Sequence, residues 1–151
     1  MSKKLSPRNV PVQQRARRQR DKILKATSEL LETVGVDELT TIRVAEAVGI
    51  SVGTLYHYFP NKHAILHSLA ENWIETVLDG LEDISQRDLS TVAIKDFVVL
   101  ITRVFEDLLI KHSPLLPLIN AINTLPELNS LKVDFKQQLI KALGGIFIDL
   151  N

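Results

Sequence analysis

The 151-residue chain contains no cysteine, which excludes disulfides and thiolate chemistry and suits a reducing cytoplasm. It has no apolar run long enough to span a bilayer. Its basic N-terminus, MSKKLSPRNVPVQQRARRQR, lacks the apolar segment and the cleavage site of a secretory signal. No P-loop, nucleophile elbow or dinucleotide fingerprint occurs, so the sequence favours no enzymatic activity and implies no cofactor.

The chain also has no net charge, because 18 basic residues balance 18 acidic ones. The two halves nevertheless differ in sign. Residues 1–62 carry 11 basic and 6 acidic side chains, whereas residues 63–151 carry 7 basic and 12 acidic side chains. A basic half suits a polyanionic partner, and the alternative is a chance clustering of charge in a basic tail.

Apolar residues recur with helical spacing, and no alternating strand pattern or internal repeat occurs. The sequence therefore predicts an all-α fold. The expected helices span about 13–34, 41–48, 52–59, 62–84, 91–112, 114–123 and 126–143. The fifth, TVAIKDFVVLITRVFEDLLIKH, is apolar nearly all round and is expected to be buried. The last is expected to end before Gly144-Gly145, which leaves an apolar tail.

The stretch DELTTIRVAEAVGISVGTLYHYF predicts two short helices joined by a tight turn. A threonine can cap the first helix, on which Ile42, Ala45 and Val48 are expected to face one side. Gly49 ends it, and Ser51 can cap the second helix. Two short helices with this junction are typical of a helix-turn-helix, and the alternative is an ordinary helical hairpin.

Aromatic residues make up only 5% of the chain, yet TLYHYF holds both of its tyrosines and one of its five phenylalanines. On a helix that begins after Ser51, Leu55 and Phe59 share one face, which we expect to be buried. Gly53 and His57 point roughly the opposite way, with the tyrosines on the flanks. Hydroxyls and an imidazole can donate to phosphate oxygens, and glycine lets the backbone approach a surface closely. The tyrosines could instead pack at the edge of the core.

The segment TTIRVAEAVGISVGTLYHYFPNKHAIL, preceded by ILKATSELLETVGVDELT, resembles the DNA-binding part of the TetR family of bacterial transcriptional regulators. The resemblance covers roughly residues 16–75, and its most specific part is GISVGTLY at 49–56. It implies a ligand-responsive repressor that binds a palindromic double-stranded DNA operator as a homodimer in the cytoplasm, without a membrane. The alternative is a helical protein-interaction module that does not bind DNA.

The resemblance also implies which residues contact DNA, and we expect three kinds of contact. Ser51 and Thr54 hydrogen-bond bases, Gly53 allows close approach, and Val52 touches a thymine methyl. Thr41 and Arg43, on the helix before, reach the backbone or a flanking base. The expected phosphate contacts are Tyr56, His57, Tyr58 and Lys62. Lys62 begins a helix, where a cation opposes the helix dipole, so this position is expected to need an anion.

Three domains are expected from this resemblance: a disordered basic arm over 1–14, a DNA-binding domain over 15–62, and a helical ligand-binding and dimerisation domain over 63–151. In the last domain a small-molecule effector is expected to contact Trp73, Phe97 and Phe105. The two long helices that usually end such proteins are not evident in the sequence. A homodimer is still expected, because a partner would cover the apolar tail.

His63, His67 and Glu71 are spaced by four residues along one predicted helix. This spacing can hold a divalent metal ion. The helix lacks the adjacent glutamate of a zinc protease, and no other ligand cluster is evident, so no metal site is predicted.

Overall fold

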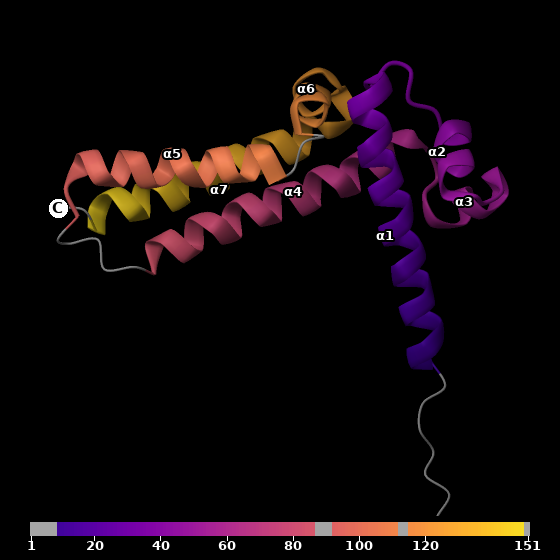
Figure 1. Ribbon diagram of the computed structural model, residues 1–151, viewed down its shortest axis with the longest axis horizontal. Helices are drawn as coiled ribbons and strands as arrows, with labels where there is room; N and C mark the ends of the chain where they lie inside the picture. The colour runs from indigo at the N-terminus through magenta and orange to yellow at the C-terminus, as the bar shows by residue number, and fades with distance from the viewer. Residues whose placement is uncertain (1–8, 87–91, 112–114, 150–151) are drawn as a thin grey trace, which may run out of the picture. The chain divides into compact units, whose positions relative to one another are not determined.

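The computed structural model describes residues 9–86, 92–111 and 115–149, and these ranges contain helices and short connections but no strand (Figure 1). The prediction of an all-α fold is confirmed. The chain divides into two compact units, Met1–Lys62 and His63–Asn151, each considered by itself. The helices are α1 (Asn9–Val34), α2 (Thr41–Val48), α3 (Val52–Tyr58), α4 (Lys62–Ser85), α5 (Ile94–Lys111), α6 (Leu115–Thr124), the 3-10 turn η1 (Pro126–Leu128) and α7 (Asn129–Asp149).

Helix α1 is longer than the sequence predicts. Residues 9–14, expected to lie in a disordered arm, form its first turns. Pro11 lies in the first turn, where its missing N–H breaks no intrahelical bond, and the two glutamines that follow extend a helix readily. Ile23, Thr27 and Leu31 recur every four residues on its buried face. The Gly35 amide donates to the Leu31 carbonyl at 3.0 Å, and the φ of 72° at this glycine turns the chain out of the helix.

Helices α2 and α3 form a helix-turn-helix with a cap at each boundary. The hydroxyl of Thr40 accepts from the Arg43 amide and caps α2, and Gly49 ends that helix with a φ of 75°. Ser51 then caps α3. Only two residues, Gly49 and Ile50, separate α2 from this cap, so the two helices are held in a fixed turn.

The two short helices bury the side chains that make the core of the first unit. Leu55 and Phe59 are buried, as predicted, and the guanidinium of Arg20 on α1 lies 5.1 Å from the centre of the Phe59 ring. On α2 the buried pair is Val44 and Ala45. Ile42 lies more than 100° around the helix from the centre of that pair, and it is 56% exposed. The expectation that Ile42 shares the buried face is therefore wrong.

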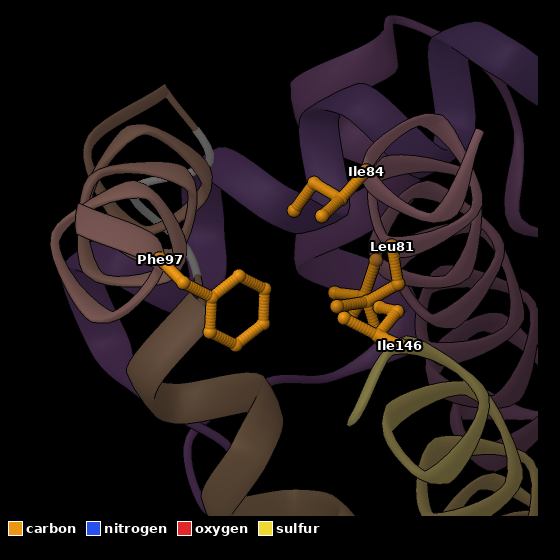
Figure 2. Packing of buried hydrophobic residues seen from close by; sticks show 5 residues of the cluster. Leu81, Ile84, Phe97 and Ile146 are labelled. Carbon is orange, nitrogen blue, oxygen red and sulfur yellow. The ribbon is translucent and has the colours of Figure 1, made fainter. Parts of the chain in front are cut away.

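The second unit has a core built from three helices. Val77, Leu81 and Ile84 of α4 meet Phe97 of α5 and Ile146 of α7, and all five side chains are buried. The ring of Phe97 points toward Leu81 and Ile146 (Figure 2). Val77, Leu81 and Ile84 are spaced by four and three residues, so they lie on one face of α4.

Two expectations for the second unit are wrong. Helix α5 is not buried all round, because it exposes Ile94, Val98 and Val99. Helix α7 does not end before Gly144 but continues to Asp149. Neither Gly144 nor Gly145 has a positive φ, and the helix is anchored beyond them by the buried side chain of Ile146. In the described ranges, no helix is long and apolar enough to cross a membrane.

Candidate nucleic-acid interface

The start of α3 presents two hydroxyls that are joined to each other. The Thr54 amide donates to Ser51 Oγ at 3.0 Å, and Ser51 Oγ lies 2.8 Å from Thr54 Oγ1. Both side chains are exposed. One hydroxyl must donate to the other, and the remaining hydroxyl keeps its hydrogen. In either direction the pair therefore offers one O–H donor outward, held in place by the cap of the helix.

Gly53 lies between these hydroxyls and is exposed. Its φ is not positive, and a Cβ built on it would meet only Ser51 Oγ, at 3.9 Å. The fold therefore has no steric need for glycine here, although glycine weakens a helix relative to alanine. By contrast, Gly35 and Gly49 adopt the left-handed conformation that other residues avoid. The bare backbone at Gly53 suits close approach by a partner.

Helices α2 and α3 lie side by side (Figure 1). A second pair of hydroxyls, one from each helix, connects them. Thr41 Oγ1 lies 3.2 Å from the Tyr56 hydroxyl, and the ring of Tyr56 is 49% exposed. As in the first pair, one O–H remains free to donate. Beside these residues is an open groove of about 320 Å³, lined by Asp37, Leu39, Thr40, Thr41, Tyr56, Asn61 and Lys62.

Lys62 has protein partners that the sequence does not reveal. Its part-buried ammonium donates to the carbonyl oxygens of Val36 and Leu39, each at 3.4 Å. These carbonyls belong to the connection between α1 and α2. The protein's own carbonyl dipoles therefore help to balance the cation at the start of α4, and contact with a phosphate stays a prediction.

The other expected contact residues lie on the same two helices or beside them. Arg43 is exposed and donates to Glu38 at 3.2 Å, so a partner would have to compete with that carboxylate. His57 is exposed, and its ring meets that of Tyr58 edge-on at 5.3 Å. Val52 is half-buried at the first position of α3. The structure thus brings the expected residues together along α2, α3 and the start of α4.

Sequence reasoning missed three features of this surface. Asp37 puts a carboxylate in the lining of the groove, and Thr40 lines the groove while it caps α2. Ile42 is exposed at the start of α2. The helical spacing of Val44 and Ala45 was a signal that could have separated Ile42 from the core.

The three expected effector contacts have different surroundings. Phe97 is only 3% exposed and belongs to the core, so it does not line an open site. Trp73 is half-buried and meets Phe135 edge-on at 5.3 Å, and its buried indole nitrogen has no hydrogen-bond partner among the described residues. The side chain of Phe105 lies outside the described residues.

The histidines of α4 each pair with a carboxylate. His67 Nδ1 lies 3.3 Å from Glu71, and His63 Nδ1 lies 3.6 Å from Glu127. Within the ranges that the structure describes, no three histidine, aspartate or glutamate side chains come together in a way that could hold a metal ion.

Known proteins are similar to the chain over the helices that carry this surface. Residues 23–69 match the model of bacterial regulatory proteins of the tetR family. The matched residues include α2, α3 and the start of α4. The similarity to the tetR family is therefore shown for the helix-turn-helix segment of the chain.

Curated bacterial proteins resemble the chain over this segment. The tetracycline repressor protein class C of Escherichia coli is 45% identical over 53 residues, which are 35% of this chain and 24% of that protein. The nucleoid occlusion factor SlmA of Actinobacillus pleuropneumoniae is 44% identical over 59 residues, or 39% of this chain and 29% of SlmA. The chain thus matches about a quarter of the length of these relatives.

The similarity of fold extends further than the similarity of sequence. A TetR-family transcriptional regulator from Mesorhizobium loti matches with a TM-score of 0.72 at 18% identity, over 90% of this chain and 69% of that one. At this identity the match establishes the fold alone. The similarity of fold therefore extends beyond residues 23–69 and into the second unit.

Proposed function

We propose that the protein is a sequence-specific DNA-binding transcriptional regulator, a repressor that binds a palindromic operator as a dimer and responds to a small molecule. The observation that carries this proposal is the exposed start of α3, where two joined hydroxyls flank a glycine that the fold does not require. The family match over the same helices supports it. In this proposal the protein binds its operator in the cytoplasm.

In this proposal the start of α3 reads base edges in the major groove. The outward O–H of the Ser51–Thr54 pair donates to an acceptor such as guanine O6 or N7, or thymine O4. Gly53 lets the helix come close enough for this contact. The half-buried side chain of Val52 packs on a thymine methyl at the same end of the helix.

The groove between α2 and the start of α4 receives a backbone phosphate. The free O–H of the Thr41–Tyr56 pair donates to a phosphate oxygen, and Lys62 supplies positive charge in the lining. The outer contacts are Arg43, His57 and Tyr58, which reach neighbouring phosphates. These contacts fix the register of α3 but carry no sequence information.

Selection of bound DNA from a random pool tests this function most economically. The full chain should enrich a palindrome whose half-sites are about one helical turn apart or a multiple of that spacing. The logarithm of its affinity should fall linearly with the logarithm of the salt concentration. A failure to enrich any sequence, together with binding that is insensitive to salt, would favour the alternative of a protein-interaction module.

Asp37→Asn should tighten binding to the selected operator by about threefold, because the change removes a carboxylate that repels phosphate in the groove. The gain should shrink as salt is added, since the ions screen this repulsion. Fluorescence anisotropy of a labelled operator at two salt concentrations measures both effects. Glu29→Gln, which changes a similar charge on exposed α1, is the matched control and should leave the affinity unchanged.

The proposed homodimer would cover apolar side chains that one copy exposes. Ile94 and Val98 lie one turn apart on α5, and Val133 and Ile140 lie two turns apart on α7. Exposed apolar side chains in register along a helix suit a protein partner. Gel filtration with light scattering should give twice the 17.0 kDa mass of the chain. A monomer at micromolar concentration would contradict the dimer.

The proposed effector acts by changing the separation of the two recognition helices in the dimer. Such coupling between sites is commonly about 1–3 kcal/mol, which weakens operator binding by roughly 5- to 150-fold. Trp73 is the side chain best placed to contact the effector, since its buried indole N–H has no acceptor in the part of the chain that the structure describes. It is also the only tryptophan in the chain, so a change in tryptophan fluorescence would report on an effector that binds beside the Trp73 indole.

A further inference from the structure

Ile42 is an apolar side chain that lies outside the core of the first unit. It is 56% exposed at the second residue of α2, next to the groove residue Thr41. Among the described residues of that unit, the other large apolar side chain with a similar exposure is Tyr56, which has its hydrogen bond to Thr41. The core is made without Ile42, because Val44 and Ala45 supply the buried face of α2.

The fold gains little from isoleucine at this position. A β-branched residue is a weaker helix former than alanine, glutamate or lysine, any of which the exposed position would accept. The neighbouring exposed positions of α2 hold Arg43, Glu46 and Ala47. A single exposed isoleucine needs no explanation by itself, so its meaning depends on what lies beside it.

The position of Ile42 relative to the groove supplies that context. Thr41 Oγ1 lies 3.2 Å from the Tyr56 hydroxyl, so the start of α2 is held against the middle of α3. If the Thr41–Tyr56 pair holds a phosphate, the nucleotide that carries this phosphate lies beside the start of α2. The side chain of the next residue, Ile42, then faces the rim of the DNA groove that α3 enters.

Only one base offers an apolar group there. In the major groove, the edge of thymine carries a C5-methyl, whereas the other edges present hydrogen-bond donors and acceptors. Arginine or glutamine at this position would read a guanine or an adenine, but isoleucine cannot form those hydrogen bonds. Among the groups on the base edges, the one that suits its exposed branched side chain is the thymine methyl.

We infer that Ile42 is a specificity-determining residue, which packs on the C5-methyl of a thymine at one position in each operator half-site. This inference rests on the proposed function, and it adds α2 to the elements that read sequence. The thymine lies outside the base pairs contacted by Ser51, Val52 and Thr54, because Ile42 is on the neighbouring helix. The operator therefore has a preferred A·T pair flanking the segment that α3 reads.

Uracil substitution tests the contact, because it removes the thymine methyl and leaves every hydrogen-bonding group of the base intact. The operator selected from the random pool is synthesised with each thymine replaced in turn by deoxyuridine, symmetrically in both half-sites. Affinities for the full chain are measured by fluorescence anisotropy. One flanking position should lose about fourfold per methyl contact, as expected from removing one buried methyl group.

The variants identify which side chain makes the contact. For Ile42→Ala, uracil at the flanking position should no longer weaken binding, while uracil at the other positions should weaken binding as it does for the parent. Ile42→Val should retain most of the effect of uracil at the flanking position. Val52→Ala is the comparison, and it should lose sensitivity at a different thymine, nearer the centre of the α3 contacts. Circular dichroism should show that all three variants keep the helical content of the parent.

Each failure has a distinct meaning. If the selected operator binds and no uracil position depends on Ile42, the inference is overturned while the proposed function stands. If the flanking position responds to Val52→Ala and not to Ile42→Ala, the thymine belongs to α3 and the inference is again overturned. If the pool yields no bound DNA, the proposed function and this inference fall together.

Discussion

Gly53→Ala should make the first unit more stable and yet weaken operator binding by more than about tenfold. The gain in stability, about 0.5 kcal/mol, follows because alanine favours the helix and its Cβ meets only Ser51 Oγ, at 3.9 Å. The loss of affinity follows because the added methyl group occupies the space through which α3 approaches a base edge. Thermal unfolding and fluorescence anisotropy measure the two effects separately.

Gly49→Ala is the matched control for this prediction. Gly49 has a φ of 75°, so alanine there is strained and should destabilise the protein by about 1–2 kcal/mol. Gly49, which the fold requires, and Gly53, which we assign to a partner, should therefore give opposite changes in stability when each is replaced by alanine. If Gly53→Ala leaves operator affinity unchanged, α3 does not approach DNA through this face.

Lys62→Met should lower the free energy of unfolding by about 1–2 kcal/mol and weaken binding to every DNA sequence by about tenfold. Methionine keeps most of the apolar stem but removes the ammonium that donates to the carbonyls of Val36 and Leu39. Those two carbonyls are then left without this donor, and the connection into α2 loses an anchor. Chemical denaturation and anisotropy at several salt concentrations measure the two losses.

The sequence preference of the Lys62→Met variant should stay unchanged, because the residue acts on the backbone of the protein and on phosphate, not on bases. Lys25→Met is the control. Lys25 is largely exposed and its nitrogen lies 3.9 Å from Glu29, so its removal should change stability by less than about 0.5 kcal/mol. Equal stability of the two variants would contradict the structural role given to Lys62.

The helix-turn-helix could be predicted from sequence because its signals are local. A threonine cap, the glycine at 49 and the serine at 51 mark the ends of α2 and α3. The burial of Leu55 and Phe59 follows from a spacing of four residues on one short helix. Such signals depend on neighbours along the chain, so one sequence is enough to read them.

The parts that could not be predicted depend on contacts between distant segments. Lys62 donates to carbonyls that lie 23 and 26 residues away in the sequence, and no local sequence pattern predicts these partners. Ile42 looks like a core residue until the packing of α2 selects Val44 and Ala45. Gly144 and Gly145 resemble a helix stop, but the burial of Ile146 beyond them keeps the helix intact.

The central claim, that the start of α3 meets DNA, is tested most directly by the amide resonance of Gly53 in a heteronuclear NMR titration with the selected operator. The chain has six glycines, whose amides usually fall in a sparse region of the spectrum. We expect the Gly53 resonance to shift the most, together with that of Thr54, while the resonance of Gly144, on α7 of the second unit, moves little. If the operator binds and the resonances of Gly53 and Thr54 do not shift, the claim that the start of α3 meets DNA is contradicted.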